Sequence, residues 1–355
     1  MSPGGRKNEH KATGAMHWIC LTFFAALLLS SCGSDEEPLP DISGVEVNVA
    51  IDRFEHDLQR AAADTTRDGA TVLRKQYPVF FDSVWLEVML PARVGKGYDS
   101  ALVAAFAKQP VLSRLLDTVT QAFPVPAQSS SLWQADLEKS FRYAKVYFPN
   151  EPTPQVVTYV TEFGLGGFSY GRDLLGIGLD FYLGSNFRGY DPAVFPRYIQ
   201  RTMNREHIAS RAIEAWVGEL LGEAPGERML DRMIHNGKLL YIKDRLLPHV
   251  ADTAVLGFGE SALEWLTNNE TQLWAHYLDE ELLYETKPSR IGKLVGPSPN
   301  APGMPPEAPG ANANWVGMQI VQQYMQRRPD ETLPDLLVER DAQRILAQSK
   351  YKPSR

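Results

Sequence analysis

Residues 229–250 constrain what this chain can fold into more than any other stretch. Their apolar residues recur with a helical period, and Asn236 shares one face with Met233 and Leu240, so that a polar amide lies on an apolar stripe. Gly237 lies in mid-helix, where Gly costs about 1 kcal/mol relative to Ala and usually marks the close approach of another backbone. We expect a core helix with a hydrogen-bonded Asn236, and the alternative is a helix that carries a functional site.

The first 31 residues are predicted to be a targeting segment. A basic n-region with Arg6, Lys7 and Lys11 precedes an apolar stretch at 19–29 that is too short to span a bilayer. This stretch runs into Leu-Ser-Ser-Cys, which resembles the lipobox of bacterial lipoproteins and implies cleavage before Cys32 and acylation of that residue. Residues 1–31 are therefore predicted to be a lipoprotein signal peptide, and Cys32 is the predicted lipidation site.

The charge and the cysteines narrow the class of protein. The other cysteine, Cys20, lies in the predicted signal peptide, so the mature chain cannot form an internal disulfide and must be stabilised by its core. Loss of the signal peptide would change the net charge from -7 to about -9. An acidic chain without a basic stripe argues against a nucleic-acid partner.

Residues 32–44 are predicted to be a tether. The acidic run at 35–37 is followed by Pro38 and Pro40, as in a solvated linker. The run also resembles the acidic export signal of surface lipoproteins in the Bacteroidetes, and both interpretations remain open. Residues 45–355 are predicted to form a single globular domain.

The periodicity of the domain predicts an α+β fold that is mostly helical. Strands are expected at 45–51, 155–161 and 174–183, with a turn at 164–167, and these strands could form one small mixed or antiparallel sheet. No βαβ alternation is present, which argues against a doubly wound fold. Helices are expected at 52–63, 71–123 with breaks at prolines, 132–147, 201–221, 229–250, 261–266, 270–284, 315–325 and 341–347.

A series of short motifs runs through the domain. They are found at 147–149, 178–184, 233–241, 309–310, 314–317, 319–321, 324–325 and 341–346. In this order, and together with the lipobox, they resemble the gliding motility lipoprotein GldB family. Two positions depart from the expected pattern, because Asn236 stands where an acidic residue is expected and Ala311 where Arg is expected.

The resemblance implies an outer-membrane lipoprotein of the cell envelope that is needed for gliding motility or for the associated secretion and adhesin machinery. It implies membrane attachment through Cys32, periplasmic or surface exposure, and protein partners in the envelope, and it supplies no enzymatic activity or cofactor. The candidate structural or functional residues are His235, Asn236, Gly237 and Lys238, together with Trp315.

The order of sheet, helix, turn and helix also resembles the scaffold of zinc peptidases of the HExxH type. In this chain His207 is followed four residues later by Arg211, whose guanidinium cannot bind a metal, and Asn236 takes the place of the expected acid on the second helix. We therefore expect no catalytic or metal-binding residues and no enzyme. Two alternatives stay open, an atypical or degenerate metallopeptidase acting on envelope protein, and a surface protein that binds glycan or peptide through Trp315.

Overall fold

The computed structural model describes residues 38–64, 66, 68–89, 100–124 and 132–353. The predicted signal peptide, the lipidation site Cys32 and the acidic run lie outside these residues. Leu39–Arg355 form one compact unit, separate from the N-terminal residues up to Pro38. No helix in the described part of the chain combines the length and the apolar character needed to cross a bilayer.

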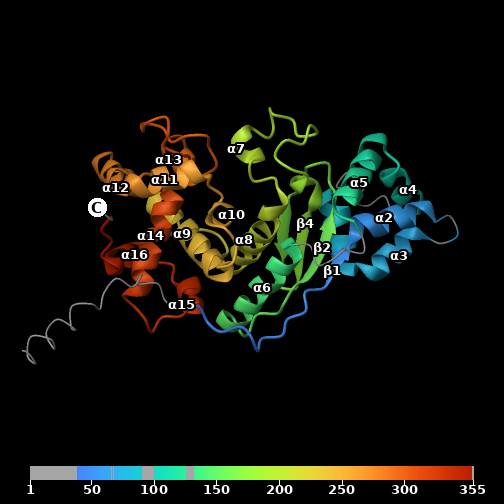
Figure 1. Cartoon of the computed structure of the whole chain (residues 1–355), viewed down its shortest axis with the longest axis horizontal. Coiled ribbons are helices and arrows are strands. Elements are labelled where there is room, and N and C mark those ends of the chain that lie inside the picture. Colours follow the sequence, from blue (N-terminus) through green and yellow to red (C-terminus); the bar gives the residue numbers. More distant parts are fainter. Residues whose placement is uncertain (1–37, 65, 67, 90–99, 125–131, 354–355) are drawn as a thin grey trace, which may run out of the picture. The chain divides into compact units, whose positions relative to one another are not determined.

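Four short strands form one mixed sheet in the order β1-β2-β4-β3 (Figure 1). They are β1 (Ile51–Arg53), β2 (Gln155–Tyr159), β3 (Gly167–Tyr170) and β4 (Leu174–Gly178). β1 and β4 lie on either side of β2 and run parallel to it, whereas β3 runs antiparallel to β4 and forms an edge. Helices make up most of the remainder, which confirms the predicted α+β class with one small mixed sheet.

The sheet separates two apolar cores, because alternate residues of a strand point to opposite faces. Val157 and Tyr159 of β2 join a smaller core built on the N-terminal helices. Val156 of β2 and Ile177 of β4 join a larger core, which is built on the helices from residue 110 onward. Both faces of the sheet are therefore covered, and every residue of β4 is buried.

The smaller core is largely aromatic. Its helices are α2 (Phe54–Ala63), α3 (Gly69–Gln76), the π-helix η1 (Phe80–Met89) and α4 (Ser100–Ala107). The Phe54 ring lies 5.2 Å from that of Tyr77, 4.7 Å from that of Phe80 and 5.7 Å from that of Trp85, measured between centroids. Such edge-to-face and tilted ring pairs add to the free energy of burial.

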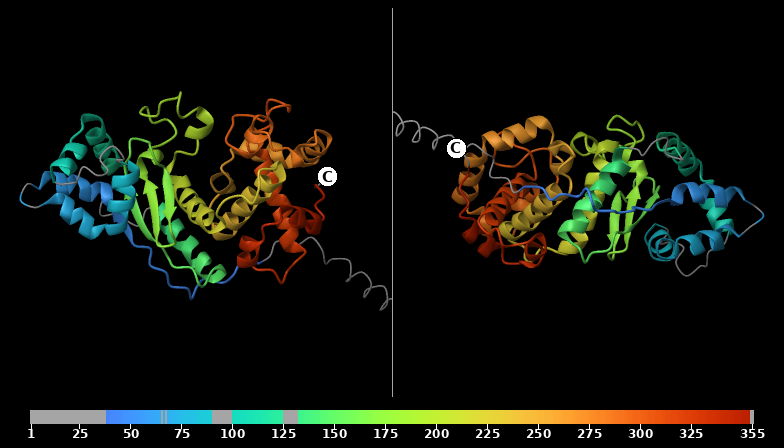
Figure 2. Two further views of the ribbon diagram at one scale, coloured as in Figure 1. Left: turned by 180° about the vertical axis from the view of Figure 1, so that it is seen from behind. Right: turned by 60° about the horizontal axis from the view of Figure 1, so that its bottom comes forward.

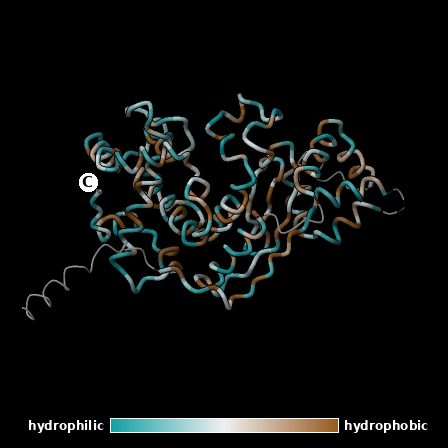
Figure 3. The backbone as a smooth tube through the Cα atoms, viewed as in Figure 1, coloured by the Kyte–Doolittle hydropathy of each residue, from teal (hydrophilic) through white to brown (hydrophobic). Residues whose placement is uncertain are grey.

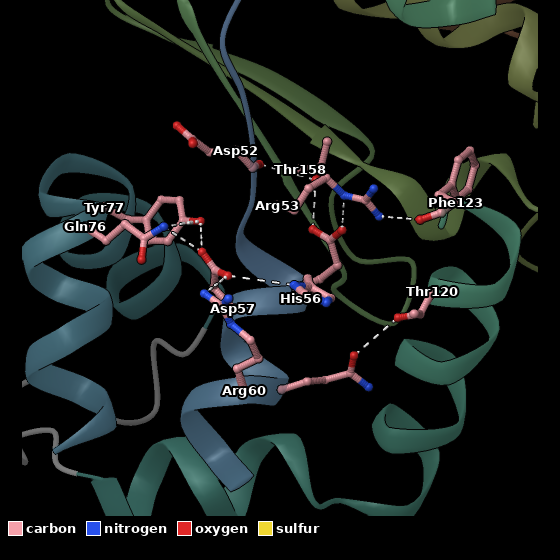
Figure 4. A network of polar contacts seen from close by, with 12 residues as sticks. Asp52, Arg53, His56, Asp57, Arg60, Gln76, Tyr77, Thr120, Phe123 and Thr158 are labelled. Carbon is pink, nitrogen blue, oxygen red and sulfur yellow. Dashed lines mark hydrogen bonds and ion pairs between the residues drawn. The ribbon is translucent and has the colours of Figure 1, made fainter. Parts of the chain in front are cut away.

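A polar network ties this core to the sheet (Figure 4). Glu55 is almost wholly buried, and its carboxylate accepts hydrogen bonds from Arg53 Nε at 2.5 Å and from Thr158 Oγ1 at 2.8 Å. The Arg53 guanidinium also donates to the carbonyl of Phe123, and Tyr77 donates to Asp57 at 2.6 Å. A buried carboxylate is tolerated only when it is paired. The charged residues at the start of α2 therefore have a structural role, which is to join the smaller core to the sheet.

The larger core is formed mainly by five helices. These are α5 (Pro110–Ala122), α6 (Leu132–Tyr147), α8 (Ile208–Leu221), α9 (Met229–Leu246) and α14 (Asn312–Gln326). The two further views in Figure 2 show α6 along one face of the sheet and α9 leading away from the sheet toward the C-terminal helices. In Figure 3 hydrophobic and hydrophilic stretches are mixed along the helices of this part of the chain. The buried residues of α8 recur with the helical period, whereas α9 is buried on most of its sides.

Shorter elements complete the unit. They are η3 (Leu179–Tyr182), α7 (Arg197–Gln200), η4 (Arg205–His207), α10 (Asp252–Leu256), α11 (Glu260–Asn268), α12 (Glu270–Asp279), η5 (Leu282–Tyr284), α13 (Pro288–Val295), α15 (Leu333–Val338) and α16 (Ala342–Ser349).

Several predicted elements have other bounds in the structure; the helix predicted at 229–250 ends at Leu246, and the one predicted at 270–284 divides into α12 and η5. Three further differences concern the sheet and α8. Residues 45–50 are not a strand, because β2 begins at Gln155 and offers a ladder partner only from Ile51 onward; Val47 and Val49 pack on the larger core as irregular chain. The strand predicted at 174–183 ends at Gly178 and turns into η3. The helix predicted at 201–221 begins only at Ile208, because residues before it form turns around Asn204, whose amide donates to the carbonyl of Arg201.

Candidate functional site: a groove along α8

A groove of about 470 Å³ runs along one face of α8. Its walls come from the start of β3, from η3, from α7 and the residues after it, and from α9. The lining residues are Gly166, Gly167, Phe181, Tyr182, Ile199, Thr202, Met203, Arg211, Glu214, Ala215 and Leu239. Segments distant in the sequence thus meet at one concave surface, the usual character of a binding site.

The helical period of α8 explains which residues face the groove. Ile208, Ile213 and Trp216 are fully buried in the larger core. Arg211 and Glu214 are three residues apart and therefore share the opposite face. The sequence of α8 thus directs its apolar stripe to the core and a charged pair to the groove.

The charged pair continues into the protein as a chain of three residues, Arg211–Glu214–Lys243. Arg211 Nη1 donates to Glu214 Oε1 at 2.9 Å, and Lys243 Nζ of α9 donates to Glu214 Oε2 at 2.7 Å. The exposed fraction of the side chain falls from 40% for Arg211 and 31% for Glu214 to 2% for Lys243. Both carboxylate oxygens of Glu214 accept hydrogen bonds, while part of the Arg211 side chain remains exposed in the groove.

The ion pairs and the burial set the protonation states of this surface. Burial favours the neutral form of Glu214, but the nearby Lys243 and Arg211 outweigh it and lower the pKa of Glu214 to about 2. Burial, followed by the charges of Arg211, Lys243 and Arg201, lowers the pKa of His207 to about 4. At neutral pH the region therefore holds an ionised Glu214, a neutral His207 and three cations.

The loop that precedes β3 is held against the groove by Asp180. Its carboxylate accepts backbone hydrogen bonds from Thr161 at 3.1 Å and Phe163 at 2.8 Å, where the chain passes through positive φ at Glu162 and Phe163. Asp180 is fully buried, and burial raises its pKa to about 6 despite those hydrogen bonds. The bend that ends β4 early thus positions the mouth of the groove.

The geometry corrects one point of the comparison with zinc peptidases. Asn236 does not face His207 at the end of η4 or Arg211 of α8, because its amide donates to the carbonyl of Val295 at 3.2 Å and to Asn314 Oδ1 at 2.9 Å. The α9 side chain that pairs with a charged residue of α8 is Lys243, which donates to Glu214. Among the described residues, no group of three or more His, Cys, Asp or Glu side chains is arranged to hold a metal ion.

Asn236 and Gly237 lie where α9 meets α13 and α14. The hydrogen bonds expected for the Asn236 amide are present, although the residue is half-buried rather than buried. A Cβ atom on Gly237 would lie 2.6 Å from the amide nitrogen of Met318, so α14 approaches as closely as the sequence predicted. These contacts are structural, and they point away from the groove.

His235 and Lys238 face the opposite way, toward α15. Lys238 Nζ donates to the carbonyls of Leu337 at 3.1 Å and Glu339 at 2.8 Å, which caps the C-terminal end of that helix. Burial lowers the pKa of Lys238 to about 8 and also lowers the pKa of His235. The cavity that both side chains help to line has a volume of only about 10 Å³, which is too small for a ligand.

Trp315 is buried in the larger core, with 6% of its surface exposed. Its ring is therefore not on the surface, where a glycan- or peptide-binding role would require it. The candidate residues of α9 and Trp315 do not converge on one site.

Glu214 and Lys243 are the residues that sequence reasoning missed. A signal existed for Lys243, which lies seven residues after Asn236 and three after Leu240 on the apolar stripe of α9. A cation on a buried stripe requires an anion nearby. Glu214 lies on the preceding helix, which forms a helical hairpin with α9, and so was a candidate for that anion.

The fold and the groove together define a mostly helical α+β protein whose groove holds one carboxylate bound by two cations. A family model for gliding motility protein GldB matches residues 35–353, and the chain belongs to this family. A search of curated proteins and a search of solved structures gave no match.

Proposed function

We propose that this protein is a lipid-anchored outer-membrane component that serves gliding motility or the associated secretion and adhesin machinery, without enzymatic activity. Its domain, residues 45–355, would bind an envelope partner in the groove along α8. The family match over residues 35–353 is the observation that carries this proposal. The lipobox ending at Cys32 supports the anchor, with residues 32–44 as the tether.

The chemistry of the groove favours binding over catalysis. Glu214 is the single carboxylate among the lining residues, and both of its oxygens accept hydrogen bonds from cations. A carboxylate whose pKa is lowered to about 2 is a poor general base, since catalysis of proton transfer needs a pKa near the working pH. Arg211 and Lys243, whose charges act on His207, cannot complete a zinc site with it.

The anchor is tested by fractionation and by cell spreading. Deletion of the gene should abolish spreading in a gliding host, and the wild-type chain should restore it. Cys32→Ala should leave a folded protein that is released by a salt wash, because a single acyl chain already binds membranes only marginally and this variant has none. Cys20→Ala, within the predicted signal peptide, is the matched control and should behave as wild type.

Three results would contradict the proposal. Unchanged spreading after deletion would remove the role in gliding, and stable membrane attachment of Cys32→Ala would place the anchor elsewhere. Stoichiometric zinc in the purified protein would favour the metallopeptidase alternative and overturn the non-enzymatic part.

A further inference from the structure

We propose that the groove along α8 binds an extended peptide segment that carries a carboxylate, with its backbone along β3 and its carboxylate on Arg211. The inference rests on the proposed function, since it names the chemistry of the partner bound there. Three features of the groove carry it, namely an excess of cations, an unpaired strand edge and apolar walls.

Cations outnumber anions around the groove. Arg211, together with Lys243 and Arg201 behind the lining, outnumbers the two carboxylates of Glu214 and Glu206, the latter with Oε1 3.8 Å from His207 Nδ1, and the joint charge of the three cations contributes to the low pKa of His207. Asp180 is the next carboxylate, but it is fully buried and two backbone N–H groups already donate to it. In a chain with a net charge of -7, this is a local surface that attracts an anionic group.

Arg211 has donors left to bind such a group. A guanidinium carries five N–H donors. The structure engages Nη1 with Glu214 and Nη2 with Thr202 Oγ1, the latter at a long 3.4 Å, while 40% of the side chain stays exposed. A carboxylate in the groove can therefore pair with Arg211 without breaking the ion pair to Glu214.

The strand edge favours a peptide as the bearer of that carboxylate. β3 is the outer strand of the sheet, and the amide of Gly178 donates to the carbonyl of Gly166 at 2.9 Å. Since hydrogen-bonded pairs alternate along an antiparallel ladder, Gly167 and Ser169 direct their N–H and C=O groups outward. Gly167 lines the groove, so an added strand would run directly past Arg211.

The remaining walls suit alternate side chains of an extended segment. Phe181, Met203 and Leu239 supply apolar surface on different elements around the cations. An anionic lipid or glycan could use the cations, but neither carries the regularly spaced N–H and C=O groups that extend a β-ladder along β3. The peptide is therefore the ligand that uses every feature of the groove.

The test measures fluorescence anisotropy of the full-length Cys32→Ala protein with labelled nonapeptides of alternating Thr and Val. One peptide has a central Glu and its match has Gln. We expect the Glu peptide to bind about tenfold or more tightly than the Gln peptide, as one charge-assisted hydrogen bond provides. Arg211→Gln should remove the difference. Arg172→Gln, which alters an exposed cation paired with Glu151 outside the lining, should leave it unchanged.

Two further arms separate the ligand classes and guard against misfolding. N-methylation of every second residue should abolish binding when the methylated amides are those that face β3. Methylation of the other set of amides should leave binding intact, because only one side of the peptide meets β3. Leu239→Glu, which brings a carboxylate into the groove itself, should weaken the Glu peptide while the melting temperature stays near wild type. Equal affinity for the Glu and Gln peptides, or Arg211-dependent binding of phosphatidylglycerol vesicles without peptide binding, would overturn the inference.

Cell spreading distinguishes failure of this inference from failure of the proposed function. If the deletion strain cannot spread but Arg211→Gln cells spread normally, the groove inference fails and the proposed function stands. If the deletion strain spreads normally, the proposed function fails whatever the peptides do.

Discussion

Gly237 of α9 and Gly317 of α14 face each other where the two helices cross, so closely that a Cβ atom on Gly317 would lie 3.5 Å from the Cα of Gly237. A Cβ on either glycine would also meet backbone atoms of the other helix, which cannot move aside as a side chain can. The crossing therefore depends on the absence of side chains at both positions.

Gly237→Ala and Gly317→Ala should each destabilise the protein. Overpacking of a tight contact costs about 1–3 kcal/mol, and here the neighbour is backbone, so the upper part of that range is expected. Urea denaturation measures the free energy of unfolding. Gly292→Ala in α13 is the matched control, because a Cβ there meets nothing within 4 Å, and it should be neutral or stabilising.

Asn236→Ala should cost about 1–3 kcal/mol, because it removes the donor to the Val295 carbonyl and to Asn314. Asn236→Glu should also destabilise, since it would set a carboxylate against two oxygen acceptors. Thermal melts of the Glu variant with and without zinc provide the measurement. A melting temperature that rises only with zinc would instead support a metal-binding role for this position.

The chain Arg211–Glu214–Lys243 should respond unequally to loss of its members. Glu214→Leu leaves the buried Lys243 without a partner and should cost about 3–5 kcal/mol. Lys243→Met should cost less, because Glu214 keeps its bond to Arg211 and the apolar stem is replaced. Equal losses in urea denaturation would show that Lys243 is not stabilised mainly by Glu214.

Asp180 should make stability depend on pH in an unusual direction. Its pKa of about 6 in the folded state lies above the ordinary value of 3.8, so the folded protein binds this proton more tightly. Its contribution to stability is greatest below pH 3.8 and is lost as the pH rises through 6.

Asp180→Asn removes this titration, so the variant should gain stability relative to wild type between pH 4 and 7, by up to about 3 kcal/mol. Chemical denaturation at a series of pH values measures the difference between the two proteins. Asp173→Asn, at an exposed position, should track wild type throughout. A difference that stays constant with pH would contradict the raised pKa of Asp180.

Local sequence patterns predicted the elements whose buried residues recur at a regular spacing. Residues 132–147 are the helix α6, as expected, because its apolar period is unbroken. Gly237 signalled the helix crossing, since only a close backbone explains Gly at that place. In these cases the physical cause lies in the sequence near the element itself.

The groove could not be predicted in this way, because its parts meet only in the folded chain. The turn predicted at 164–167 includes Gly167, where β3 begins, and no strand is predicted at 168–170. The Phe168 ring packs over Gly176 of β4, a contact across the ladder that no period within Gly167–Tyr170 reveals. The bend after Gly178 depends on Asp180 reaching back to Thr161 and Phe163. Tertiary hydrogen bonds override local strand propensity here.

The parallel pairing of β1 with β2 sets an order on folding. Ile51 pairs with Val156, so more than a hundred residues must emerge before the first strand finds its partner. On a chain delivered N-terminus first, the aromatic side chains of the segment from α2 to α4 lack until then the sheet residues Tyr159 and Phe168, which cover Phe80 in the folded protein. Such a high contact order slows closure of the sheet and leaves these rings exposed to water in the interval. The N-terminal third is therefore the part of the chain in which aromatic surface stays uncovered longest during folding.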